Sequence, residues 1–94
     1  MNIELTILYD YYGELLTKKQ QVYFEDYYFN NLSLQEIAEN YSISRNAVYN
    51  SLKEIEKKLI RFETVLKLYE KSKIIEALIV DLDDDKQNKI KELI

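Results

Sequence analysis

The stretch "SLQEIAENYSISRNAVYNSLKEIEKKL", residues 33–59, contains two helix start signals close together. Ser33 and Glu36 have the spacing of a capping box, in which each side chain accepts a hydrogen bond from the other residue's backbone N–H. Ser44 is a second N-cap candidate, and Ile43 before it pairs with Val48 as a hydrophobic staple. Two helices joined by a turn of about three residues are typical of a helix-turn-helix motif.

The composition favours an all-α protein. The chain has 94 residues, no proline and one glycine, Gly13, so both strong helix breakers are nearly absent. An apolar fraction of 47% is enough for a packed core. We therefore expect a single all-α domain over residues 1–94, built on a helix-turn-helix without a wing.

Several kinds of active site are excluded by residue type. The chain has no cysteine and no histidine, so thiolate and imidazole chemistry are impossible. No glycine-rich phosphate loop is present, and the neighbouring acids Glu25 and Asp26 point apart on a helix. We expect no enzyme activity, no cofactor and no small-molecule substrate.

The acidic stretch after residue 80 has calcium-loop spacing in part. Asp81, Asp83, Asp85 and Glu92 match the ligand positions, but Lys86 replaces the glycine that makes the sharp turn. Acids at the start of a last helix, where its dipole favours them, are the better interpretation. We therefore expect no metal site.

Apolar periodicity places the remaining helices. The first is expected over residues 3–15, and the second follows a capping box at Thr17 and Gln20. Tyr23, Tyr27, Tyr28 and Tyr41 have core spacing. No stop signal follows Ser44 for some thirty residues, and apolar residues recur there at steps of four and three: Val48, Leu52, Ile55, Leu59, Phe62, Leu66 and Tyr69. This seam predicts that the second helix of the motif continues as one long fourth helix. Residues 33–61 then form the helix-turn-helix and residues 62–94 a helical tail. The C-terminal half of the long helix needs a partner, either the tail helix or a second chain, and we expect a homodimer joined through the long helix and the tail.

The charge is unevenly distributed along the chain. The net charge is -4, but residues 1–43 carry two bases and seven acids, residues 44–73 eight bases and four acids, and residues 74–94 three bases and six acids. The only basic segment thus begins at the second helix of the motif, where the local potential favours phosphate. The acidic surroundings favour weak, salt-sensitive binding.

The second helix of the motif presents the candidate nucleic-acid contacts. Ala47, Val48 and Leu52 are expected to face inward. In this kind of motif the first turns of the second helix contact base edges, and later cations contact phosphates. The outward candidates are Arg45, Asn46, Tyr49, Asn50, Lys53, Lys57, Lys58 and Arg61.

Residues 16–59 resemble region 4 of bacterial sigma factors, in which a "slxEIA…xISrxaVy" pattern forms the promoter-reading motif. The chain is more similar still to the YlxM-type family of small bacterial helix-turn-helix proteins, through "YYGELLTKKQQVYFEDYY", "LSLQEIAENYSISRNAVY" and "EKKL…YEK". The resemblance covers roughly residues 7–71. Ser42 departs from the family pattern, which commonly has glycine in this turn. We expect the turn to form with serine in a left-handed conformation, at a cost of about 1 kcal/mol relative to glycine.

The resemblance implies a regulatory, non-catalytic protein linked to the signal recognition particle pathway, binding that particle's RNA or protein. A DNA-binding transcriptional regulator is the second hypothesis, and a protein-interaction module without nucleic-acid binding is the third. The N-terminus carries acids where a signal peptide has bases, and no apolar run reaches the length of a membrane span, so we expect a soluble cytoplasmic protein without membrane contact.

Overall fold

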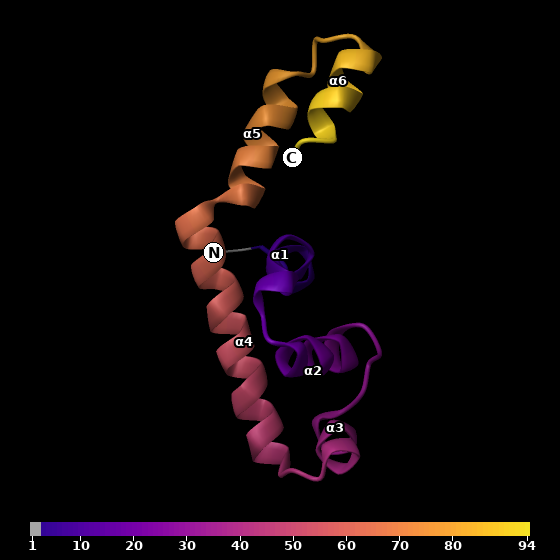
Figure 1. Cartoon of the computed structure of the whole chain (residues 1–94), viewed down its shortest axis with the longest axis vertical. Coiled ribbons are helices and arrows are strands. Elements are labelled where there is room, and N and C mark those ends of the chain that lie inside the picture. Colours follow the sequence, from indigo (N-terminus) through magenta and orange to yellow (C-terminus); the bar gives the residue numbers. More distant parts are fainter. Residues whose placement is uncertain (1–2) are drawn as a thin grey trace.

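A long helix organises the computed structural model, which describes residues 3–94. This helix, α4 (Arg45–Leu66), carries three shorter helices along one side: α1 (Leu5–Tyr12), α2 (Lys18–Tyr28) and α3 (Leu34–Tyr41). Figure 1 shows these three stacked beside α4, with α5 (Leu68–Leu78) continuing past its end after a bend and α6 (Asp84–Lys91) folding back beside α5. The described chain is all-helical, as the sequence predicts.

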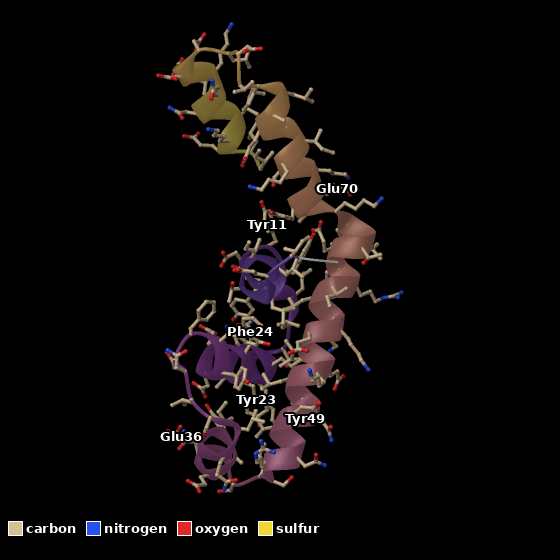
Figure 2. All side chains as sticks on the ribbon, turned by 180° about the vertical axis from the view of Figure 1, so that it is seen from behind. Tyr11, Tyr23, Phe24, Glu36, Tyr49 and Glu70 are labelled. Carbon is tan, nitrogen blue, oxygen red and sulfur yellow. The ribbon has the colours of Figure 1, made fainter. Side chains whose placement is uncertain are left out.

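The core lies where the four N-terminal helices meet. Its buried side chains come from α1, α2, α3 and α4 and from the segment joining α1 to α2: Leu8, Tyr12, Leu16, Tyr23, Phe24, Ile37, Ala38, Val48, Leu52, Ile55 and Leu59. In Figure 2, Tyr23 and Phe24 project from α2 among these neighbouring helices. Four heptad residues of α4 are therefore covered by α1 to α3 within one chain: Val48, Leu52, Ile55 and Leu59.

The first helix is shorter than the expected span of 3–15. Its α-helical part ends at Tyr12, and a 3₁₀ turn, η1, covers Gly13–Leu15. A side chain at Gly13 would come within 3.0 Å of the Tyr9 ring, so glycine permits the close approach of that ring to the backbone. The tighter turn then leads directly to the capping box of α2, in which Thr17 and Gln20 pair as predicted.

The predicted long fourth helix is confirmed, but it is shorter than the thirty or so residues over which the seam extends. α4 ends at Leu66, and Lys67 adopts a left-handed conformation with φ 57° before α5 begins. Leu66, expected in the seam, is 42% exposed. The break has a tertiary cause, because the carboxylate of Glu63 and the hydroxyl of Tyr12 accept hydrogen bonds from the first backbone N–H groups of α5.

The tyrosines with core spacing do not all reach the core. Tyr23 is buried and Tyr28 half-buried, but Tyr27 and Tyr41 are 38% and 40% exposed. Tyr41 lies at the end of α3, where its ring packs edge-on against Tyr23 and its hydroxyl donates to Asp26. Both exposed rings thus lie at the edge of the aromatic cluster.

Candidate nucleic-acid interface

The turn between α3 and α4 is formed by local backbone chemistry. Ser33 and Glu36 make the predicted capping box at the start of α3, and the Ser44 hydroxyl accepts the backbone N–H of Ala47 at the start of α4. Ser42 ends α3 at φ 56° and ψ 43°, the left-handed conformation expected for it. The Ile43 N–H then donates to the Ala38 carbonyl at 3.0 Å, which satisfies a carbonyl that the helix end would leave unpaired.

The packing of α4 decides which of its residues face solvent. Val48 and Leu52 are buried against α1 to α3, and Ala47 is half-buried, so the predicted inward face is confirmed. Lys58 is half-buried at the border of that face. The other predicted contact residues are exposed: Arg45, Asn46, Tyr49, Asn50, Lys53, Lys57 and Arg61. Because α4 has 22 residues, these side chains extend along a helix about 33 Å long.

Lys53 is the candidate cation whose charge is partly neutralised by a neighbouring acid. Its ammonium lies 3.4 Å from the Glu56 carboxylate and 5.5 Å from the centre of the Tyr49 ring, which Figure 2 shows on α4. Glu56 also accepts the Tyr28 hydroxyl at 2.8 Å. This exposed ion pair contributes little to stability, but its carboxylate lowers the positive potential at this point of the face.

Four other cations on α4 lack this neutralisation. Across residues 3–94, no ion pair involves Arg45, Lys57, Lys58 or Arg61. Glu54 is the exposed acid among them, three and four residues before Lys57 and Lys58. The basic part of the face therefore lies on the outer side of the middle of α4 and at Arg45 on its first turn.

The cavities beside this face do not suit a small molecule well. A hollow of about 120 Å³ lies between α2, α3 and α4, lined in part by Tyr27, Leu34 and Tyr49. Binding pockets for drug-sized ligands usually measure about 300–1,000 Å³. An apolar groove of about 360 Å³ lies between the start of α2 and the α3–α4 turn, lined by Lys18, Lys19, Val22, Tyr23, Tyr41 and Ile43. It is open, and no catalytic pair lines it.

Tyrosine–carboxylate hydrogen bonds are a feature that sequence reasoning missed. Four tyrosine hydroxyls donate to acids on other helices, across α1–α2, α1–α4, α2–α4 and α2–α3: Tyr9 to Glu25, Tyr12 to Glu63, Tyr28 to Glu56 and Tyr41 to Asp26. Burial, with the bond to the carboxylate adding to it, raises the pKa of Tyr9 and of Tyr12 to about 12. Four of the 17 acids thus join one helix to another. The sequence signal that could have indicated these bonds is compositional: the chain has nine tyrosines and more acids than bases.

The acidic stretch after residue 80 starts a helix, as predicted. Asp83 caps α6 by accepting the backbone N–H of Lys86 at 2.9 Å, and Asp84 and Asp85 lie in the first turn. Lys89 pairs with Asp85 at 3.3 Å. These contacts account for the acids through helix capping and the helix dipole.

No helix within residues 3–94 combines the length and the apolar character that crossing a lipid bilayer requires.

Comparisons with known proteins agree with this geometry. The model of the family UPF0122, described as "Putative helix-turn-helix protein, YlxM / p13 like", matches residues 1–94. A UPF0122 protein of Fusobacterium nucleatum is 41% identical over 83 residues, which cover 88% of this chain and 81% of the relative. One of Clostridium kluyveri is 50% identical over 74 residues, covering 79% and 67% respectively. A probable UPF0122 protein of Mycoplasma mycoides is 42% identical over 98 aligned residues, covering 98% and 87%.

The description of the family names a helix-turn-helix and does not name an enzymatic activity. The match over the whole chain and the α3–α4 geometry lead to the same conclusion: the chain belongs to the YlxM / p13-like helix-turn-helix family.

Proposed function

We propose that this protein is a non-catalytic regulator that binds nucleic acid through the outer face of α4. The observation that carries the proposal is the group of cations on that face, Arg45, Lys57, Lys58 and Arg61, which have no acidic partner within residues 3–94. Cations that remain available can replace the counterions of a phosphate backbone. Asn46, Tyr49 and Asn50 lie exposed on the first turns of the same helix, where base contacts are made in helix-turn-helix proteins.

The resemblance to the YlxM-type family supports a narrower proposal. We infer that the protein acts in the signal recognition particle pathway, on that particle's RNA or protein components. The alternative is a DNA-binding transcriptional regulator, which the likeness of residues 16–59 to sigma region 4 supports. A protein-interaction module without nucleic-acid binding remains the third hypothesis.

The test is a fluorescence anisotropy titration of labelled signal recognition particle RNA and of a random DNA duplex of equal length, each at two salt concentrations. We expect tighter binding to the RNA, weakening as salt rises because counterions are released. Equal, weak binding to both would favour the transcriptional hypothesis. No binding to either would refute the proposal and leave the interaction module.

Charge-reversal variants locate the binding face. Lys57→Glu with Arg61→Glu should weaken RNA binding by at least about tenfold, because two phosphate contacts are lost and two repulsions are added. The matched control is Lys86→Glu with Lys91→Glu on α6, at the far end of the molecule (Figure 1). Both variants change the net charge from -4 to -8, since each reversal adds two negative charges. Equal loss in both would mean that only overall charge matters.

A further inference from the structure

The arm formed by α5 and α6 leaves apolar side chains uncovered. The chain measures 53 × 23 × 21 Å, and its radius of gyration of 16.8 Å exceeds the value of about 12 Å expected for a compact domain of this length. Figure 1 shows the arm extending beyond the part formed by α1 to α4, with α6 lying along one side of α5 only. Ser72, Ile75 and Ile79 face the covered side, whereas Ile74 is 52% and Leu78 76% exposed.

Ile74 and Leu78 form one apolar strip. They are four residues apart on a helix, so they lie one above the other on the same face. Val80 follows directly and is also strongly exposed. A monomer rarely leaves such residues contiguous and open to water, because burying them is favourable.

The charges flanking the strip identify what covers it. Lys71 lies exposed one turn before Ile74, and Lys67 lies at the start of α5. Glu70, also exposed, lies beside them, so this end of the strip carries two cations and one acid. The other end of the strip is followed by an exposed acid, Asp81, and by the acidic start of α6. The surface is thus basic at one end, apolar in the middle and acidic at the other end.

Such a surface is complementary to itself when turned around. In an antiparallel pair, the basic end of one copy meets the acidic end of the other, and a two-fold axis makes every contact twice. Placing Ile74 opposite the partner's Leu78 sets Lys71, three residues before Ile74, at the same end as the partner's Asp81, three residues after Leu78. We propose that two copies of this chain associate antiparallel through this outer face of α5.

This interface differs from the heptad seam that first suggested a homodimer. The seam residues Val48, Ile55 and Leu59 are buried within the monomer and are unavailable to a partner. The proposed interface uses residues of α5, whereas the candidate nucleic-acid residues all lie on α4, so the proposal stands independently of the proposed function. We expect a weak dimer, because one eleven-residue helix per chain makes a small interface.

Sedimentation equilibrium of the full chain from about 5 μM to about 500 μM tests the proposal. We expect a reversible monomer–dimer equilibrium in the wild type and a monomer for Leu78→Lys at every concentration. Leu15→Lys is the matched control, since Leu15 is a similarly exposed leucine in η1, and it should dimerise like the wild type. A monomeric wild type, or unchanged dimerisation of Leu78→Lys, would overturn the proposal.

Charge exchange tests the antiparallel arrangement. Lys71→Asp and Asp81→Lys should each weaken dimerisation about tenfold, since each sets like charges against one another. The double variant should return to within about twofold of the wild type, because opposite charges face each other again. Failure of the double variant to recover would refute this pairing. Leu78→Lys should still bind nucleic acid at high protein concentration, which separates a failure of dimerisation from a failure of the α4 face.

Discussion

At the scale of single residues, Glu63 explains where the long helix stops. Its carboxylate is 3% exposed and accepts three hydrogen bonds, from the Tyr12 hydroxyl at 2.6 Å and from the backbone N–H groups of Tyr69 and Glu70 at 3.0 and 3.1 Å. The Tyr12 hydroxyl in turn accepts the N–H of Leu68 at 3.0 Å. The first three N–H groups of α5 are thus capped from α4 and α1, and both oxygens of the buried carboxylate accept hydrogen bonds. Figure 2 shows Glu70 at this bend.

Removing the Tyr12 hydroxyl should therefore destabilise the whole protein. In Tyr12→Phe, the Leu68 N–H loses its acceptor and one donor to Glu63 is lost, inside a buried site. We expect the free energy of unfolding to fall by about 1–3 kcal/mol, measured by urea denaturation. Tyr49→Phe is the matched control, since the Tyr49 ring is exposed on α4, and it should change stability by less than about 0.5 kcal/mol. A Tyr12→Phe variant as stable as the control would contradict the proposed role of this site.

At the scale of elements, two of the three non-glycine residues in left-handed conformations within residues 3–94 lie before and after α4. Ser42 at φ 56° separates α3 from α4, and Lys67 at φ 57° separates α4 from α5. An L-residue pays about 1 kcal/mol for this conformation, so neither turn forms from local preference alone. Capping on both sides holds the first turn, and the Tyr12–Glu63 site holds the second.

Glycine at the first turn should stabilise the motif. Ser42→Gly removes the steric cost of the left-handed conformation, offset in part by the greater freedom of glycine in the unfolded chain. We expect a gain of up to about 1 kcal/mol in the free energy of unfolding and a higher melting temperature by circular dichroism. Ser44→Ala, two residues away, should act in the opposite direction by about 1 kcal/mol, because it removes the N-cap of α4. Destabilisation by Ser42→Gly would show that the serine side chain has a role beyond the turn.

At the scale of the whole molecule, the tyrosine–carboxylate bonds make the stability of the fold decrease at both low and high pH. Burial by itself raises the pKa of Glu63, but its hydrogen bonds from Tyr12, Tyr69 and Glu70 outweigh this effect and lower the pKa below 4.5. A carboxylate with a lowered folded pKa stabilises the protein above its unfolded pKa and loses that contribution as pH falls. The pKa values of Tyr9 and Tyr12 are raised to about 12, so these two residues stabilise the protein at lower pH and lose that contribution as pH rises.

The stability contributed by these tyrosines should be complete below pH about 10 and should disappear as pH rises toward 12. Urea denaturation across this range should therefore show a steep alkaline loss. The same series in Tyr12→Phe should show a smaller loss, since one of the shifted groups is gone. An equal slope in both proteins would mean that Tyr12 ionises alike in the folded and unfolded chains.

Several features could be predicted from the sequence because their causes are local. The caps at Thr17, Ser33 and Ser44 act within one helical turn, and the inward face of α4 follows from helical periodicity. The helix-turn-helix and the set of exposed residues on α4 depend on these two signals alone. Whether those residues bind nucleic acid stays a prediction, because exposure does not specify a ligand.

The sequence by itself thus determined an all-helical chain, its helix starts and the sidedness of α4. Only the tertiary structure decided that α4 stops at Leu66, that most of its seam is covered within one chain, and that four acids of α2 and α4 accept tyrosine hydroxyls. The physical reason is the distance between the partners: a cap or a helical face involves residues within about four positions. Tyr12 and Glu63 are 51 positions apart, and their contact arises only when α1 packs on α4.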